Sequence, residues 1–173
     1  MAFSMVSCGT QKAAVSKNEN DELRIQSKFL GVQFGDSPTR VYMKVAGKHP
    51  TKKSDGSYTI CDQEFAGYNW HYVQMGFVEK MLSIVNFQQE FNSKSSAEAR
   101  FESIYRVLRM KYGEMEPTSS GDGFKFSDSV KNAVIVTVHP GISRGGKDFW
   151  YCDLTYYWGG GVLLTYMKSL SEI

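Results

Sequence analysis

Residues 68–89, YNWHYVQMGFVEKMLSIVNFQQ, decide the fold class of this 173-residue chain. The first half alternates two sets of side chains, His71, Val73, Met75 and Phe77 against Trp70, Tyr72, Gln74 and Gly76. A period of two is typical of a β-strand whose two faces meet different surroundings. Glu79-Lys80 then predicts a tight turn into a second strand over residues 81–89. The stretch therefore predicts antiparallel sheet.

Further strands are expected on both sides of this hairpin. They cover residues 28–35, 57–65, 132–139, 148–158 and 161–168. Arg144-Gly145-Gly146-Lys147 and Gly159-Gly160-Gly161 predict the hairpin turns between the last three strands, because glycine reaches the positive φ angles that such turns need. An aromatic content of 14% also favours strands.

Two helices are predicted. Ser95-Ser96-Ala97-Glu98 forms a capping box, and an apolar stripe follows it at helical spacing. The stripe consists of Ala97, Phe101, Ile104 and Leu108, and Gly113 ends the helix. A shorter helix has Ser37 as its N-cap and Pro38 at its first position, runs to Ala46 and stops at Gly47.

These elements predict an α+β fold in which two helices cover one antiparallel sheet. The loop Pro50-Thr51-x-x-x-Asp55-Gly56 recurs as Pro117-Thr118-x-x-x-Asp122-Gly123, each time after a helix and before strands. We therefore expect a tandem repeat of helix-strand-strand-strand units, with halves at 36–91 and 95–168, inside one globular domain over 28–173. Joining two such units gives both helices a sheet to cover.

The N-terminal segment indicates a lipid anchor. Met5-Val6-Ser7-Cys8 matches a lipobox, which makes Cys8 the lipidated residue. Residues 9–27 are polar, mixed in charge and expected to form a flexible tether. This places the domain in the cell envelope, in the periplasm or on the outer membrane. A chance match is the alternative, since no basic segment precedes the short apolar run, and the chain is then cytoplasmic.

The duplicated order of one helix and a three-stranded meander resembles the architecture of the β-lactamase inhibitor protein family and of small outer-membrane-assembly lipoproteins. Together with Phe29-Leu30-Gly31-Val32 and the Cys8 lipobox, it also resembles uncharacterised envelope lipoproteins of Gram-negative gut bacteria. This resemblance implies a non-catalytic role in binding or assembly.

Composition and charge argue against several function classes. The formal net charge is +2 without a run of Lys or Arg, which disfavours nucleic-acid binding. No apolar stretch approaches the roughly 18 residues of a membrane-spanning helix, so membrane contact is expected only through the anchor. His49, His71 and His139 lack closely spaced ligand partners, and neither glycine cluster lies between a strand and a helix, so no metal or cofactor is predicted.

Cys152 allows three interpretations. With His139 and Asp153 it fits a small exported thiol hydrolase. It also alternates with Leu154 and Tyr156 on an apolar face, which predicts a buried, inert thiol. In an oxidising compartment it could instead form a disulfide with Cys61.

A binding surface is suggested by the face of the 148–158 strand opposite Cys152, together with aromatic residues of the strand that begins at residue 68. Trp70, Tyr72, Tyr151 and Tyr157 are the predicted binding residues, since exposed aromatic rings suit a protein or glycan partner. The alternative is that these rings fill a second core layer. The favoured function is a non-enzymatic envelope lipoprotein that binds a protein partner or cell-wall glycan. The alternatives are the thiol hydrolase using Cys152 and His139, and a soluble protein inhibitor.

Overall fold

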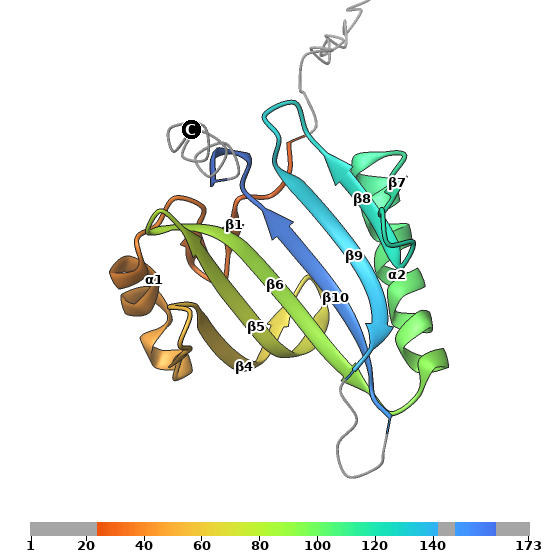
Figure 1. Cartoon of the computed structure of the whole chain (residues 1–173), viewed down its shortest axis with the longest axis horizontal. Coiled ribbons are helices and arrows are strands. Elements are labelled where there is room, and N and C mark those ends of the chain that lie inside the picture. The colour runs from red at the N-terminus through yellow and green to blue at the C-terminus, as the bar shows by residue number, and fades with distance from the viewer. Residues whose placement is uncertain (1–23, 142–147, 162–173) are drawn as a thin grey trace, which may run out of the picture.

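The computed structural model describes residues 24–141 and 148–161. Its main feature is a curved antiparallel sheet of eight strands in the order β3-β4-β5-β6-β10-β9-β8-β7 (Figure 1). The strands are β3 (Thr51–Lys52), β4 (Tyr58–Phe65), β5 (Tyr68–Val78), β6 (Met81–Phe91), β7 (Glu116–Pro117), β8 (Gly123–Ser127), β9 (Ala133–Pro140) and β10 (Trp150–Tyr157). The predicted α+β class with a large antiparallel sheet is confirmed.

Two tight turns shape the first half of the sheet. Ala66-Gly67 joins β4 to β5 and Glu79-Lys80 joins β5 to β6, and all four residues have positive φ. Two positive φ angles in a two-residue loop suit the twist of paired antiparallel strands. The predicted tight turn at Glu79-Lys80 is confirmed, because these two residues alone connect β5 to β6. At the centre, β6 pairs with β10, from Phe91 opposite Trp150 to Ile84 opposite Tyr157.

Helix α2 (Lys94–Tyr112) covers one half of the core face through contacts with β6, β9 and β10. The predicted stripe is confirmed, because Ala97, Phe101, Ile104 and Leu108 are all buried. The expected capping box lies two residues too late: Ser93 is the N-cap, and its hydroxyl accepts a hydrogen bond from the Ser96 amide at 3.2 Å. Gly113 ends the helix as expected.

Helix α1 (Pro38–Val45) packs against β2 and β6 and buries Val41 and Val45. The Ser37 side chain caps it by accepting from the Arg40 amide at 3.3 Å, as expected. A 3-10 turn, η1 (Ala46–Lys48), extends it, and the left-handed residue is His49 with φ 53°. The predicted stop at Gly47 is therefore wrong by two residues.

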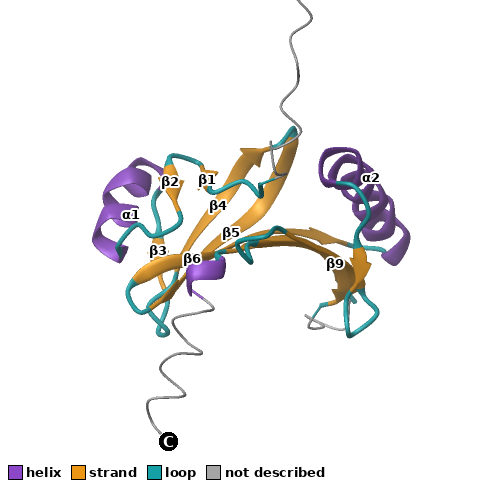
Figure 2. Cartoon of the chain, turned by 90° about the horizontal axis from the view of Figure 1, so that it is seen from above, coloured by secondary structure: helices purple, strands orange, loops and turns teal. Residues whose placement is uncertain are grey.

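A short hairpin packs on the other half of the core face, with α1 beside it (Figure 2), so the expected cover of the sheet by two helices is not confirmed. Residues 28–35 do not form one strand, because Leu30 and Gly31 have φ angles of 49° and 93°. They fold the segment into β1 (Lys28–Phe29) and β2 (Val32–Gln33), which buries both Phe29 and Val32. Ile25 is also buried, and its amide donates to Asp128, so the predicted tether ends before residue 25.

The C-terminal half differs from expectation in two respects. β8 lies where a loop was expected, and Gly159–Gly161 adopt helical geometry rather than a hairpin turn. The expected turn at 144–147, the rest of the strand expected over 161–168, and Cys8 lie outside the described residues. No helix in the described part of the chain is long and apolar enough to cross a membrane.

Candidate functional site

The sheet face opposite α2 carries polar side chains in register, and we call it the open face. Its residues are Tyr72 and Gln74 on β5, Ile84, Asn86, Gln88 and Glu90 on β6, Ile135, Thr137 and His139 on β9, and Tyr151, Asp153, Thr155 and Tyr157 on β10. They share this face because directly opposite residues, and alternate residues along a strand, point to the same side. Helix α2 packs on the other face, whereas the short helical segment over residues 159–161 lies on the same side of the sheet as the open face (Figure 2).

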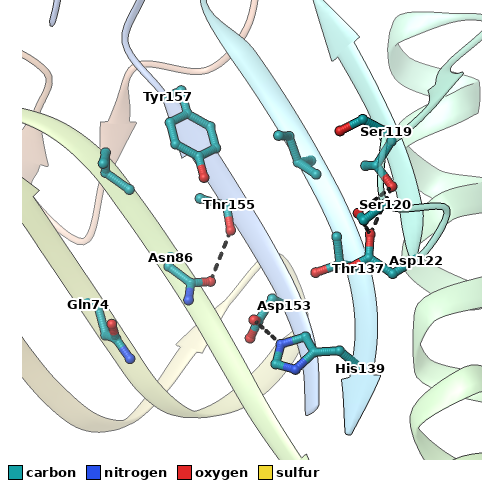
Figure 3. A pocket seen from close by; sticks show the side chains of 13 residues that line it. Gln74, Asn86, Ser119, Ser120, Asp122, Thr137, His139, Asp153, Thr155 and Tyr157 are labelled. Atoms are coloured by element: carbon teal, nitrogen blue, oxygen red, sulfur yellow. Dashed lines mark hydrogen bonds and ion pairs between the residues drawn. The ribbon is translucent and has the colours of Figure 1, made fainter. Parts of the chain in front are cut away.

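A hollow of about 540 Å³ lies in this face (Figure 3). Its floor is formed by side chains of the central strands, and one wall is the loop between β7 and β8. That loop is fixed by Asp122, whose Oδ1 accepts hydrogen bonds from the hydroxyls of Ser120 and Thr118, the latter at 2.8 Å. The Ser120 hydrogen bond is the largest cause of the lowered Asp122 pKa. The volume falls in the range of small-molecule sites.

His139 and Asp153 face each other in the hollow (Figure 3), with 2.8 Å between His139 Nε2 and Asp153 Oδ2. The other ring nitrogen, Nδ1, lies 3.1 Å from the Pro140 carbonyl oxygen. Each nitrogen thus has an acceptor, and the Asp153 hydrogen bond is the main cause that raises the His139 pKa. The arrangement favours the imidazolium form.

Asp153 has unused hydrogen-bonding capacity. The residue is only 9% exposed, and its second oxygen, Oδ1, has no hydrogen-bond partner among the described residues. Leaving a buried carboxylate oxygen without a donor is costly and uncommon in folded proteins. This oxygen is shielded from solvent and is an unsatisfied acceptor beside the hollow.

Asn86 supplies the complementary group. The Thr155 hydroxyl donates to Asn86 Oδ1 at 3.2 Å, which leaves the Asn86 amide hydrogens available as donors in the described structure. Gln74 lies in the same register row, also lines the hollow and is exposed. The hollow therefore offers acceptors and donors side by side.

No protein-family model, curated protein or solved structure matches this chain. The geometry of the site is therefore the basis for inferring a function. Among the described residues, no group of three or more His, Cys, Asp or Glu side chains could hold a metal ion.

Three of the four predicted binding residues lie on the open face. Tyr157 lines the hollow, and the Tyr151 hydroxyl donates to Glu90 at 3.3 Å. Trp70 is the exception: it is fully buried and donates from Nε1 to the Phe65 carbonyl. The period of two breaks between Trp70 and Val73, next to Asp62 of β4, whose φ is 52° and which forms no register pair, and Trp70 faces the core against Phe87.

The structure does not bring Cys152 and His139 together. Their strands are neighbours, but Cys152 faces the core while His139 lies on the open face. Burial raises the pKa of the Cys152 thiol to about 12, which makes it a poor nucleophile. The proposed thiol-hydrolase pair is therefore wrong.

The disulfide between Cys61 and Cys152 is also absent, since both are free cysteines. Cys61 on β4 is separated from β10 by β5 and β6. Three strand spacings amount to about 14 Å, whereas bridged Cα atoms lie within roughly 7 Å.

We expect the two thiols to differ sharply in reactivity. In the native protein at neutral pH, iodoacetamide should label exposed Cys61, while buried Cys152 should react only after denaturation. Peptide mapping by mass spectrometry distinguishes the two sites. Labelling of native Cys152 as fast as Cys61 would contradict the burial described above.

The His139–Asp153 pair leads to a second expectation. In an NMR titration, His139 should have a pKa above the ordinary 6.5, and Asp153→Asn should lower it. Because the folded-state pKa is raised, the pair stabilises the fold fully below the unfolded-state pKa, and this contribution is lost as pH rises through the folded-state pKa. Asp62→Asn, at an exposed position of β4, is the matched control and should leave the His139 titration unchanged.

Several lining residues were not predicted from the sequence. Asn86, Thr137 and Thr155 lie on strands that were expected, but their convergence depends on the β6–β10 pairing. Thr118 and Asp122 had been noted only as part of a recurring loop motif. That motif was the one available signal for this wall of the hollow.

Proposed function

We propose that this chain is a non-catalytic binding module of the cell envelope, whose open face holds a protein partner or a cell-wall glycan. One observation carries the proposal: Asp153, a residue that lines the hollow and is only 9% exposed, keeps one carboxylate oxygen without a hydrogen-bond partner among the described residues, and neither α1 nor α2 covers the hollow. A buried polar group with an unsatisfied acceptor is a feature of sites that are completed by a ligand.

The chemistry of the hollow favours binding over catalysis. Both nitrogens of His139 face acceptors, so the ring is held as a charged positioning group rather than as a free base. Among the described residues, no hydroxyl or thiol forms a hydrogen bond to His139 that could activate it as a nucleophile. Cys152 lies on the other side of the sheet.

The architecture is consistent with duplication, which we include in the proposal. Each half contains a helix, a two-residue strand and three longer strands, and β6 and β10 meet at the centre. The helices differ in length, eight residues in α1 and nineteen in α2, and the β1–β2 hairpin occupies the space beside the shorter one. Two joined meanders make an open face wider than either half alone.

The anchor is tested by the mass of the mature N-terminus from native cells, together with membrane fractionation. We expect a diacyl or triacyl adduct on Cys8, loss of residues 1–7, and recovery in the membrane fraction. An unmodified chain that starts at Met1 in the soluble fraction would remove the anchor from the proposal.

The binding face is tested by capture from envelope extracts on the immobilised full chain. Tyr157→Ala removes a ring that lines the hollow, and Tyr42→Ala removes a 48% exposed ring on α1 as the matched control. We expect capture of a component to be lost with Tyr157→Ala and retained with Tyr42→Ala. Equal capture by both variants, or no capture by the unaltered chain, would contradict the proposal.

A further inference from the structure

We propose that the hollow binds an uncharged carbohydrate, with Asp153 Oδ1 accepting a hydrogen bond from a sugar hydroxyl. This inference rests on the proposed function, since it names the class of ligand for the same face. Three properties of the lining support it: its charge, its mixture of donors and acceptors, and its apolar side.

The charge of the lining disfavours ionic ligands. Its titratable groups are Asp122, Asp153, His139 and the phenol of Tyr157, and the described lining contains no Lys or Arg. Phosphate and carboxylate ligands are usually held by such cations, and here they would face two carboxylates. The His139 imidazolium offsets the charge of Asp153, which weakens any advantage for a cationic ligand.

The hydrogen-bonding pattern suits hydroxyl groups. Asp153 Oδ1 is an acceptor, while the amides of Asn86 and Gln74 and the hydroxyl of Thr137 provide donors. Groups on neighbouring strands lie about 5 Å apart, and alternate residues along one strand about 7 Å apart. A sugar hydroxyl donates and accepts at once, so several hydroxyls on one ring can use such a grid together.

One end of the hollow is apolar. Ile84, Ile135 and the ring of Tyr157 lie in adjacent register rows and line the hollow. A tyrosine offers an apolar ring face with a polar tip, which matches the C–H face and hydroxyl rim of a sugar. The opposite end holds the His139–Asp153 pair, so the hollow gives a bound ring a preferred orientation.

The experiment is an NMR titration of the ¹⁵N-labelled full chain with defined trisaccharides at millimolar concentration. The neutral probes are triacetylchitotriose, cellotriose and mannotriose. The charged comparators are deacetylated chitotriose, which is cationic, and trigalacturonate, which is anionic. We expect at least one neutral probe to shift the amide signals of Asn86, Asp153 and Thr155, with the charged comparators weaker.

Matched variants assign the binding to the hollow. Asp153→Asn removes a charged acceptor and should weaken affinity roughly 10-fold or more, while Asp62→Asn, at an exposed position of β4, should not change it. Gln74→Ala, which alters an exposed residue, should also weaken binding, whereas Asn69→Ala on the same strand should not. This second pair keeps the test valid if Asp153→Asn lowers the amount of folded protein.

The outcomes separate the two proposals. Unshifted open-face signals with every neutral probe, or tighter binding of a charged comparator, would overturn the carbohydrate assignment. If the Tyr157-dependent capture described above still succeeds, the binding face stands and takes a different ligand, such as a protein. If that capture also fails, the proposed function falls with the inference.

Discussion

Replacing Phe29 by alanine should lower the free energy of unfolding by about 3–5 kcal/mol, the usual cost of removing a buried aromatic ring. Phe29 is 1% exposed, and its ring lies 4.8 Å from that of Tyr156 and 5.2 Å from that of Phe34. It also contacts Phe65 and Phe87. The Phe29 ring therefore fills the space between the β1–β2 hairpin and the centre of the sheet. Urea unfolding followed by circular dichroism measures the change.

Tyr42→Ala is the control for this variant. Tyr42 is 48% exposed, and within the described ranges its ring contacts that of Tyr58, so we expect a loss of about 1 kcal/mol or less. A similar small loss for Phe29→Ala would mean that residues 28–33 are not part of the cooperative fold in solution.

Trp70→Ala should be equally damaging, again by about 3–5 kcal/mol. The indole is fully buried, 5.6 Å from the Phe87 ring, and its Nε1 donates to the Phe65 carbonyl oxygen at 3.1 Å. Removing it creates a cavity and also removes one hydrogen bond to the Phe65 carbonyl, which adds to the cost. The same unfolding measurement tests this.

Asn69→Ala is the control at the neighbouring exposed position, and we expect it to change stability by about 0.5 kcal/mol or less. The distinction matters for function, because Trp70 was a predicted binding residue. A stable Trp70→Ala protein that loses partner capture would return Trp70 to the binding surface and contradict its burial.

The sequence predicts elements whose signal is local. The α2 stripe and the Glu79-Lys80 turn depend on residues a few positions apart, and both were correct. Prediction from the sequence fails where tertiary packing overrides the local pattern. Leu30-Gly31 lies inside an apolar run that suits one strand, and only packing of Phe29 onto the core explains why the chain turns there.

The site illustrates the same limit. His139 was associated with Cys152, whereas its partner is Asp153, one residue along the chain. Successive residues of a strand point to opposite faces, so a shift of one residue in the register reverses the chemistry. The face of Cys152 was predicted correctly, but the register that sets His139 beside Asp153 arises from the β9–β10 pairing.

The two outermost strands, β3 and β7, are each only two residues long. The first ends in a lysine, and the second includes Pro117, which has no amide hydrogen to donate. These two strands themselves offer little backbone to a foreign strand, and lysine or proline at an edge disfavours edge-to-edge pairing. Recognition at these two strands would therefore depend on side chains rather than on the addition of a strand.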